Sequence, residues 1–297
     1  MTGGPFHRGE LEAQALAGGG SSGGAIRDRM PAQHRTFFEA LPFVVVASVD
    51  RDAPVATLWT GTPGFVAAPD PETLRIAVDL DPADPASRAF TAGAPFGLLG
   101  LQPATRRRNR ANGVITAAGA GSITVAIRQS FGNCPQYIHP RELRRARPGT
   151  AATEALDRLD HEAAQRIAGA DTLFVATSAR LGEPTGGVDV SHRGGPTGFV
   201  RIDGDVLTIP DFSGNHYFNT LGNLVSEPRA ALLFADFLTG DLLHLQGTTE
   251  IQWDGPEVRA LDGAERLWRF HVERGWRRPG AMALRWIVPP ASTSLAG

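Results

Sequence analysis

Short apolar segments, separated by Gly, Pro and Asp, follow one another along most of the chain. Five of them are TLRIAV (73–78), VLTIP (206–210), ALLFADF (231–237), LLHLQGTTEIQW (242–253) and MALRWIV (282–288). Short segments rich in Val, Ile, Leu and Phe are typical of β-strands. Because few long helical patterns lie between them, we predict a mainly β chain with flanking helices, in which antiparallel sheets roll into barrels.

Other segments predict helices. Pro31 suits the first position of a helix that runs through AQHRTFFEAL (32–41). Thr153 is a candidate cap for a second helix with one apolar face. That face would comprise Leu156, Leu159, Ala163 and Ile167.

Two further segments differ from the strand pattern. A closing helix is predicted from Pro256 to residue 270, with Val258, Leu261 and Leu267 directed inward. The Gly- and Ser-rich segment 16–28 predicts a flexible linker. Residues 1–15 would then form an arm whose position the pattern does not define.

The chain contains two copies of one pattern. Gly64-Phe65-Val66 matches Gly198-Phe199-Val200, Leu98-Leu99 matches Leu232-Leu233, and Gly113 matches Gly247, each at a separation of 134 residues. A repeat at one separation favours tandem copies of a domain, with chance similarity as the alternative. We therefore expect an arm and linker (1–29), a first barrel (30–148) and a second barrel (149–297).

Composition excludes several classes of function. A net charge of −2 and a pI near 6.5 give no reason to expect a nucleic-acid or membrane partner. The single cysteine, Cys134, forbids an internal disulfide and a multi-cysteine metal site. All 29 basic residues are arginine, so neither a Schiff-base lysine nor a Walker phosphate loop is present. With no apolar span and no secretory signal, we expect a cytoplasmic protein.

The order of features resembles the pyridoxamine 5′-phosphate oxidase-like family of flavin-binding split barrels, in particular its longer members with tandem barrels. The matching stretches lie at 6–14, 30–43, 106–113, 130–138, 189–200, 209–224 and 236–247. The resemblance implies two tandem six-stranded antiparallel split β-barrels that form a pseudo-dimer. It also implies FMN in the cleft between two barrels, supplied by one chain or by a homodimer.

The segment VDVSHRGGPTGFV (188–200) would supply phosphate donors in such a site. Ser191 offers a hydroxyl, Arg193 a guanidinium, and Gly194 and Gly195 offer exposed backbone N–H groups. His192 would face either the flavin or solvent. The first copy lacks these residues at the same place, which favours a site over a glycine-rich hairpin loop.

A second polar segment follows at 209–224. Its candidate cofactor residues are Asp211, Asn215, Asn219, Thr220 and Asn223. In the related oxidases this strand, turn and helix start contact the cofactor phosphate, often with a lysine or arginine that is absent here. The resemblance then assigns the phosphate to Thr220, backbone N–H groups and Arg193. An N-capped helix that begins near Asn215 is the alternative.

The run TRRRNR (105–110) is the third candidate. On a strand its alternate side chains face opposite sides, so Arg108 would reach from the first copy to a phosphate in the second. Solvated arginines are the alternative, and Asn112-Gly113 is interpreted as a turn. We interpret Cys134 as a small buried residue, and the eight histidines show no metal-binding spacing.

Taken together, these features predict an FMN-binding flavoprotein, an oxidoreductase that exchanges a hydride between flavin N5 and a small molecule. NAD(P)H and dioxygen are candidate partners, and no general acid or base stands out. A true pyridoxamine 5′-phosphate oxidase is disfavoured because that enzyme is usually a shorter, single-barrel chain. The alternatives are a haem-binding split barrel with His192, His216 or His244 as ligand, a non-catalytic flavin-binding module, and a deazaflavin protein.

Overall fold

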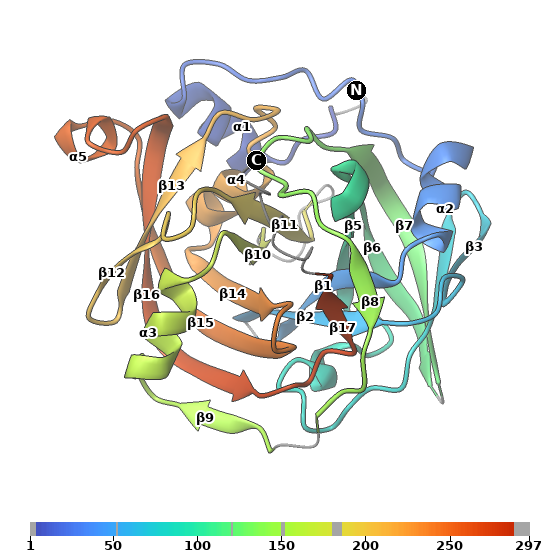
Figure 1. Ribbon diagram of the computed structural model, residues 1–297. Coiled ribbons are helices and arrows are strands. Elements are labelled where there is room, and N and C mark those ends of the chain that lie inside the picture. Colours follow the sequence, from blue (N-terminus) through green and yellow to red (C-terminus); the bar gives the residue numbers. More distant parts are fainter. Residues whose placement is uncertain (1–3, 52, 120, 150–151, 180–185, 288–297) are drawn as a thin grey trace, which may run out of the picture.

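The computed structural model describes residues 4–51, 53–119, 121–149, 152–179 and 186–287 (Figure 1). Its first sheet has the order β2-β1-β5-β6-β7-β4-β3, and every neighbouring pair is antiparallel. The strands are β1 (Phe43–Asp50), β2 (Ala53–Thr60), β3 (Val66–Asp70), β4 (Thr73–Ala77), β5 (Pro95–Gln102), β6 (Arg107–Gly119) and β7 (Ser122–Gly132).

The second sheet repeats this arrangement with the order β11-β10-β14-β15-β16-β13-β12. Its strands are β10 (Thr172–Ser178), β11 (Val188–Gly194), β12 (Arg201–Asp203), β13 (Val206–Phe212), β14 (Arg229–Asp236), β15 (Asp241–Gln252) and β16 (Ala264–Arg278). Two short pairs add to it: β9 (Glu154–Leu156) joins β16, and β8 (Leu143–Arg145) pairs with β17 (Leu284–Trp286). The mainly β split-barrel class is confirmed, although each sheet path has seven strands instead of six.

The two sheets pack against each other through strands that are buried on both faces. In β1, Val44 and Val46 face the core of the first sheet, whereas Phe43, Val45 and Ala47 join a separate cluster. That cluster also contains Phe174 and Val190 of the second sheet. The continuous apolar run FVVVA therefore reflects a strand between two cores. We call the contact between the sheets the seam.

The helices are short. They are α1 (Arg8–Leu16), α2 (Ala32–Glu39), α3 (His161–Ala168), α4 (Asn219–Ser226) and α5 (Pro256–Arg259), with 3₁₀ turns at Ser87–Ala89 and Pro103–Thr105. The helix expected after Pro31 is α2, with Pro31 at the cap. In the described ranges, no helix is both long and apolar enough to cross a membrane.

Two helix predictions were wrong. The helix expected from Thr153 begins only after Asp160, whose side chain accepts a hydrogen bond from the N–H of Ala163 at 2.8 Å. The residues before it form β9, because they pair with β16. The closing helix ends at Arg259, and the following residues form β16, which directs Trp268 and Phe270 into the second core.

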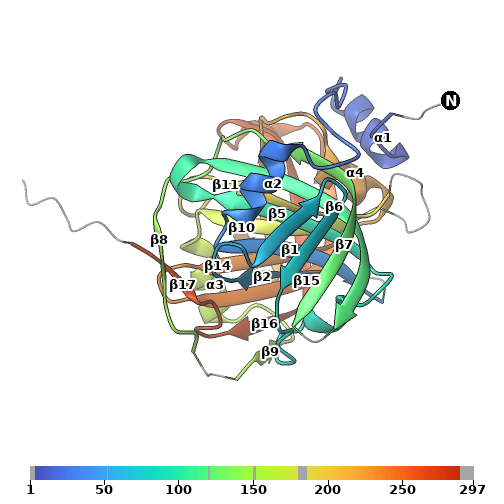
Figure 2. The same cartoon turned by 90° about the vertical axis from the view of Figure 1, so that its right-hand side faces the viewer.

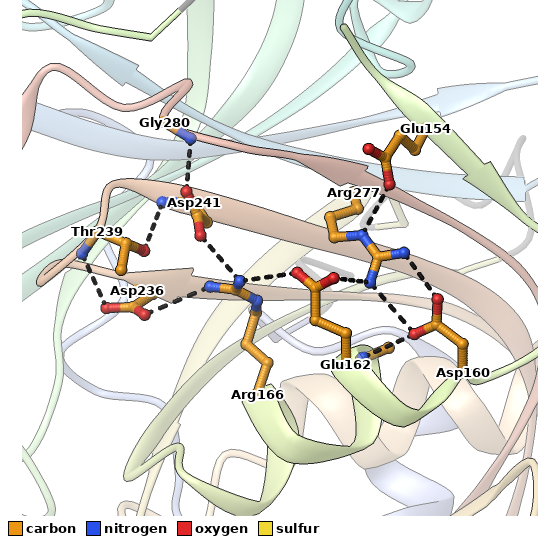
Figure 3. Close-up of polar contacts among 10 residues, drawn as sticks. Glu154, Asp160, Glu162, Arg166, Asp236, Thr239, Asp241, Arg277 and Gly280 are labelled. Atoms are coloured by element: carbon orange, nitrogen blue, oxygen red, sulfur yellow. Dashed lines mark hydrogen bonds and ion pairs between the residues drawn. The ribbon is translucent and has the colours of Figure 1, made fainter. Parts of the chain in front are cut away.

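Ion pairs hold α3 against the second sheet (Figure 3). Arg166 contacts Asp236 at 3.3 Å and Asp241 at 2.8 Å. Arg277 of β16 contacts Asp160 at 2.7 Å and two further carboxylates, those of Glu154 and Glu162. Each of these arginines thus has several carboxylate partners.

The N-terminal arm is an ordered part of the fold. Figures 1 and 2 show α1 beside α4, at one end of the second sheet. The segment expected to be a flexible linker bonds to both halves: Ser21 N–H donates to the carbonyl of His216, and Arg27 exchanges backbone bonds with Ser130 of β7. The flexible-linker prediction was therefore wrong, because backbone pairing fixes a segment whose composition alone suggests freedom.

Candidate functional site

Nine of the ten predicted cofactor residues line one cleft where the seam meets the start of α4. Its volume is about 90 Å³, below the roughly 300 Å³ of a small ligand pocket. The nine residues are Arg108, Ser191, His192, Arg193, Gly194, Asp211, Asn215, Asn219 and Thr220. A space of this size suits a phosphate group, with a larger ring at its opening.

Strand β11 presents two different faces to its surroundings. Alternate residues of a strand point to opposite sides, and Val188 and Val190 enter the apolar seam. Asp189, Ser191 and Arg193 make polar contacts on the other side. The segment for which a glycine-rich hairpin loop was the alternative is thus mostly a strand, and Ser191 is only 2% exposed.

Arg110 of β6 is the central donor of the cleft. Its guanidinium donates to Ser191 Oγ at 2.5 Å and to Asn219 Oδ1 at 3.2 Å. Ser191 Oγ lies 2.8 Å from Thr220 Oγ1 of α4. An arginine from the first sheet therefore binds a hydroxyl of the second sheet, and that hydroxyl in turn bonds to one of α4. The predicted arginine run contained Arg110, but Arg108 was chosen as the ligand.

The cleft holds positive charge with few counter-charges. Arg108 bonds to His192, to Nδ1 at 3.0 Å and to the carbonyl at 3.4 Å. No carboxylate within the described ranges forms an ion pair with it, and its buried Nε has no partner. Burial, together with Arg110 and Arg193, lowers the pKa of Arg108 to about 9. Burial also lowers the pKa of Arg110, against the opposing effect of Asp189.

Arg193 and Asp211 play different parts from those expected. Arg193 Nη1 lies 2.5 Å from Asp211 Oδ1, and Arg266 Nη1 lies 2.8 Å from the other oxygen. Asp211 therefore orients two arginines and would repel a phosphate. Because its charge is already paired, Arg193 is a weaker phosphate donor than Arg108 or Arg110. Burial lowers the pKa of His192 well below its usual value, so this imidazole is neutral.

Planar side chains line the mouth of the cleft. Tyr137 stacks on Phe212 with ring centroids 5.3 Å apart, and His216 stacks on Phe218 at 5.9 Å. Tyr137, His216 and Phe218 have positive φ angles of 63°, 54° and 59°. Non-glycine residues adopt this conformation rarely, and it is enriched at binding sites. These rings provide flat surfaces next to the arginines.

Asn223, the tenth predicted residue, lies outside this cleft. Its Nδ2 donates to Thr177 Oγ1 at 3.0 Å, and its Oδ1 lies 2.8 Å from His7 Nε2. It borders a second polar cavity of about 680 Å³, together with Glu10, Asn112 and Asp189. Asn223 lies one turn further along α4 than Asn219, which places it beyond the cleft.

The turn expected at Asn112-Gly113 is a bulge inside β6. Asn112 Nδ2 donates to Asp189 Oδ1 at 2.6 Å. Because a Cβ at Gly113 would lie 2.0 Å from the carbonyl of Ala126, glycine is required by close packing.

The matching position in the first sheet is already filled. In the first sheet Thr57 pairs with Val46, and Val46 pairs with Leu98. In the second sheet Ser191 pairs with Val175, and Val175 pairs with Leu232. Thr57 and Ser191 therefore occupy equivalent positions. The Thr57 hydroxyl donates to Asp84, and Arg278 of β16 also binds this carboxylate at 2.7 Å. A buried hydroxyl and an arginine from the opposite sheet thus hold an internal anion here. Among the described residues no carboxylate bonds to the Ser191 hydroxyl, and Asp189 lies 3.5 Å from Nη1 of Arg110.

The candidate haem ligands have different surroundings. His192 Nδ1 is bonded to Arg108. His244 is buried, its Nδ1 lies 3.0 Å from the carbonyl of Ala56, and the adjoining cavity measures about 10 Å³. His216 lies at the mouth of the cleft. Across the described part of the chain, no group of three or more His, Cys, Asp or Glu is arranged to hold a metal ion.

The second half of the chain is similar to a known protein family. The family model described as pyridoxamine 5′-phosphate oxidase matches residues 159–286. No curated protein matches the chain.

Three solved structures with similarity to this chain each cover about two fifths of it. HupZ of Group A Streptococcus is 19% identical, with 42% of this chain and 98% of that chain covered and a TM-score of 0.34. A putative pyridoxamine 5′-phosphate oxidase of Lactobacillus delbrueckii is 14% identical, with coverage of 40% and 93% and a TM-score of 0.33. An FAD-binding protein of Mesorhizobium loti is 12% identical, with coverage of 42% and 97% and a TM-score of 0.30.

Proposed function

We propose that this chain, whose residues 159–286 match the pyridoxamine 5′-phosphate oxidase family model, is a split barrel of that family and binds FMN in the seam cleft. One observation carries the proposal. Arg108 has no carboxylate partner among the described residues, and Arg110 has one, Asp189 at 3.5 Å, while both lie beside the hydroxyls of Ser191 and Thr220. Burying an unpaired cation is costly, and a phosphate would remove that cost.

The donors fit a phosphate better than any other part of FMN. Guanidinium groups bind phosphate through several N–H groups at once, and Arg110 already reaches Ser191 Oγ. Arg108 and Arg110 supply the charge that the related oxidases often place near Asn219-Thr220. The Asp84 carboxylate, held by Thr57 and Arg278 in the first sheet, shows that this part of the fold accommodates an anion.

The remainder of FMN would extend toward the mouth. The Tyr137–Phe212 and His216–Phe218 pairs offer flat surfaces for the ring. The cleft must widen to admit it, because the enclosed volume is about 90 Å³. Asn215, which donates to Asn133 at 3.2 Å, is placed to contact the ribityl chain or the ring edge.

The proposed site needs both halves of the chain. Arg108 and Arg110 come from residues 30–148, whereas Ser191 and Thr220 come from residues 149–297. We infer tandem barrels that act as a pseudo-dimer, supported by the identical strand order of the two sheets. Such a chain completes a site without a second copy, and a homodimer would only add to it.

An FMN held in this way would give the protein its redox chemistry, a hydride exchange at flavin N5. We infer a cytoplasmic oxidoreductase that acts on a small molecule, with NAD(P)H or dioxygen as the second reactant. The side chains of the cleft bind and orient; His192 is neutral and bonded to Arg108, so it holds no proton for transfer to substrate at Nδ1.

A comparison of FMN with riboflavin tests the phosphate site. Riboflavin has the same ring and no phosphate, so we expect it to bind about tenfold more weakly or worse, because charge-assisted hydrogen bonds are lost. Arg110→Met should weaken FMN binding to the riboflavin level. Arg201→Met, at an exposed arginine of β12, is the matched control. Equal binding of FMN and riboflavin would place the cofactor elsewhere.

A further inference from the structure

The N-terminal arm lies against the proposed site with close backbone contact. A Cβ at Gly222 of α4 would lie 2.5 Å from the Cα of Glu10, and a Cβ at Gly9 would lie 2.3 Å from the carbonyl of Gly222. Two glycines therefore let α1 and α4 approach closely. This contact fixes the position of Glu10, which is 3% exposed.

Glu10 is the first member of a chain of hydrogen bonds that ends in the cleft. Its Oε1 accepts from Asn219 Nδ2, and Asn219 Oδ1 accepts from Arg110 Nη1 at 3.2 Å. Arg110 then donates to Ser191 Oγ at 2.5 Å. On the arm itself, the N–H of His7 donates to Glu10 Oε2 at 2.9 Å. Glu10 thus selects the orientation in which the Asn219 carbonyl faces Arg110.

We propose that Glu10 is a positioning residue of the anion site: through Asn219 it fixes the guanidinium of Arg110 for a bound phosphate. The proposal rests on the FMN site argued above. It gives the arm a function, because the arm completes the cofactor site from 209 residues away in the sequence.

The protonation of Glu10 adds a dependence on pH. Burial, and then the charge of Asp189 on β11, raise the pKa of Glu10 to about 8, while His7, Asn219 and Arg110 of β6 oppose that rise. At pH 7 the carboxyl group is mainly neutral, and the charge of Arg110 remains available to a ligand. Above pH 8 Glu10 ionises, adds a negative charge beside Arg110, and disfavours a bound anion.

The size of this effect follows from the neutral fraction of Glu10. With a pKa of about 8, that fraction falls about fourfold between pH 7 and pH 8.5, and the affinity falls with it if only the neutral form binds. The titration of the ligand itself contributes little to this change between pH 7 and pH 8.5, because the second pKa of a phosphate monoester is about 6.

The test measures FMN binding by fluorescence titration at pH 7 and pH 8.5, with inorganic phosphate as a competing probe. The wild-type chain should bind about fourfold more weakly at pH 8.5. Glu10→Gln should keep the affinity seen at pH 7 and lose the pH dependence. Glu10→Ala should bind FMN about tenfold more weakly at both pH values, because Asn219 loses the hydrogen bond through which Glu10 holds Arg110 in position. Leu11→Ala, at an exposed position of α1, is the control.

Asn219→Ala breaks the same chain of bonds from the other side. The double variant of Glu10→Ala and Asn219→Ala should bind no more weakly than the weaker single variant, since both remove one interaction. Additive losses, an unchanged affinity in Glu10→Ala, or a fourfold loss from pH 7 to pH 8.5 that persists in Glu10→Gln would each overturn the proposal; Arg108, whose pKa is about 9, causes only a smaller loss over this range. If Arg110→Met also binds FMN as tightly as the wild type, the proposed function itself fails. If the Glu10 variants bind FMN as tightly as the wild type but Arg110→Met does not, only the positioning role fails.

Discussion

Replacing Arg108 by Met should make the ligand-free protein more stable and abolish its response to phosphate. Arg108 carries a charge that is partly removed from water, and no carboxylate of the described chain pairs with it. A binding site often stores such a cost, whereas a structural arginine stabilises the fold. Whether Arg108→Met raises or lowers the free energy of unfolding therefore distinguishes a binding role of Arg108 from a structural one.

The structure gives the magnitude. The pKa of Arg108 falls from its ordinary value to about 9, which corresponds to at most about 5 kcal/mol at about 1.4 kcal/mol per unit. Partial exposure reduces this value, and the loss of the bond to His192 Nδ1 removes about 1–2 kcal/mol. We expect a net gain of about 2 kcal/mol in the free energy of unfolding.

Urea unfolding at pH 7 measures this change. The buffer should contain little salt and neither phosphate nor sulfate, so that the cleft stays free of anions. Added phosphate should raise the unfolding free energy of the wild type by mass action and leave Arg108→Met unchanged.

Arg277 provides a matched control of opposite sign. It contacts Asp160, Glu154 and Glu162 (Figure 3), and the hydrogen bond with Asp160 is the main cause of its raised pKa. Arg277→Met should lower the unfolding free energy by about 2 kcal/mol, because its partners are left unpaired. If Arg108→Met destabilises the protein as Arg277→Met does, Arg108 is structural and the anion-site reasoning is wrong.

Three further predictions concern the cleft and the arm. Ser191→Ala should weaken FMN binding about tenfold. Arg193→Ala should weaken it less than Arg110→Met does, because Asp211 already pairs with Arg193. If flavin occupancy after purification is unchanged in both Ser191→Ala and Arg193→Ala, the cofactor binds elsewhere. Asp84 fills the counterpart position, so titration should reach about one FMN per chain, and two would contradict the comparison of the sheets. Gly222→Ala should cost about 1–3 kcal/mol in urea unfolding, since its methyl group meets Glu10; an unchanged midpoint would show that the arm is loosely held.

Local sequence patterns predicted much of the fold. Short apolar runs are visible within a few neighbouring residues and indicated the strands. Matching residues 134 positions apart indicated that the two halves are alike, and the two halves have the same strand order. The helix expected at 256–270 shows the limit, because its apolar residues also suit a strand. Pairing with β15, the strand that precedes the segment, and with the more distant β13 decided the outcome.

The candidate site was predictable only where its chemistry lay in one segment. The segments around Ser191 and Asn219 stood out by composition and line one cleft, while their role in binding a cofactor stays a prediction. Arg110 could not be distinguished from Arg108, because both occupy the same face of a strand. Glu10 gave no local signal, since its partners Asn219 and Arg110 meet it only through the folded arm.

The most direct test of the central claim is the identity of the small molecule released when the purified protein is denatured. We expect FMN, at about one molecule per chain, with a flavin absorption spectrum before release. A haem with its Soret band, a flavin without phosphate, or a protein that takes up no flavin even when FMN is supplied would contradict a phosphate site at Arg108, Arg110 and Ser191.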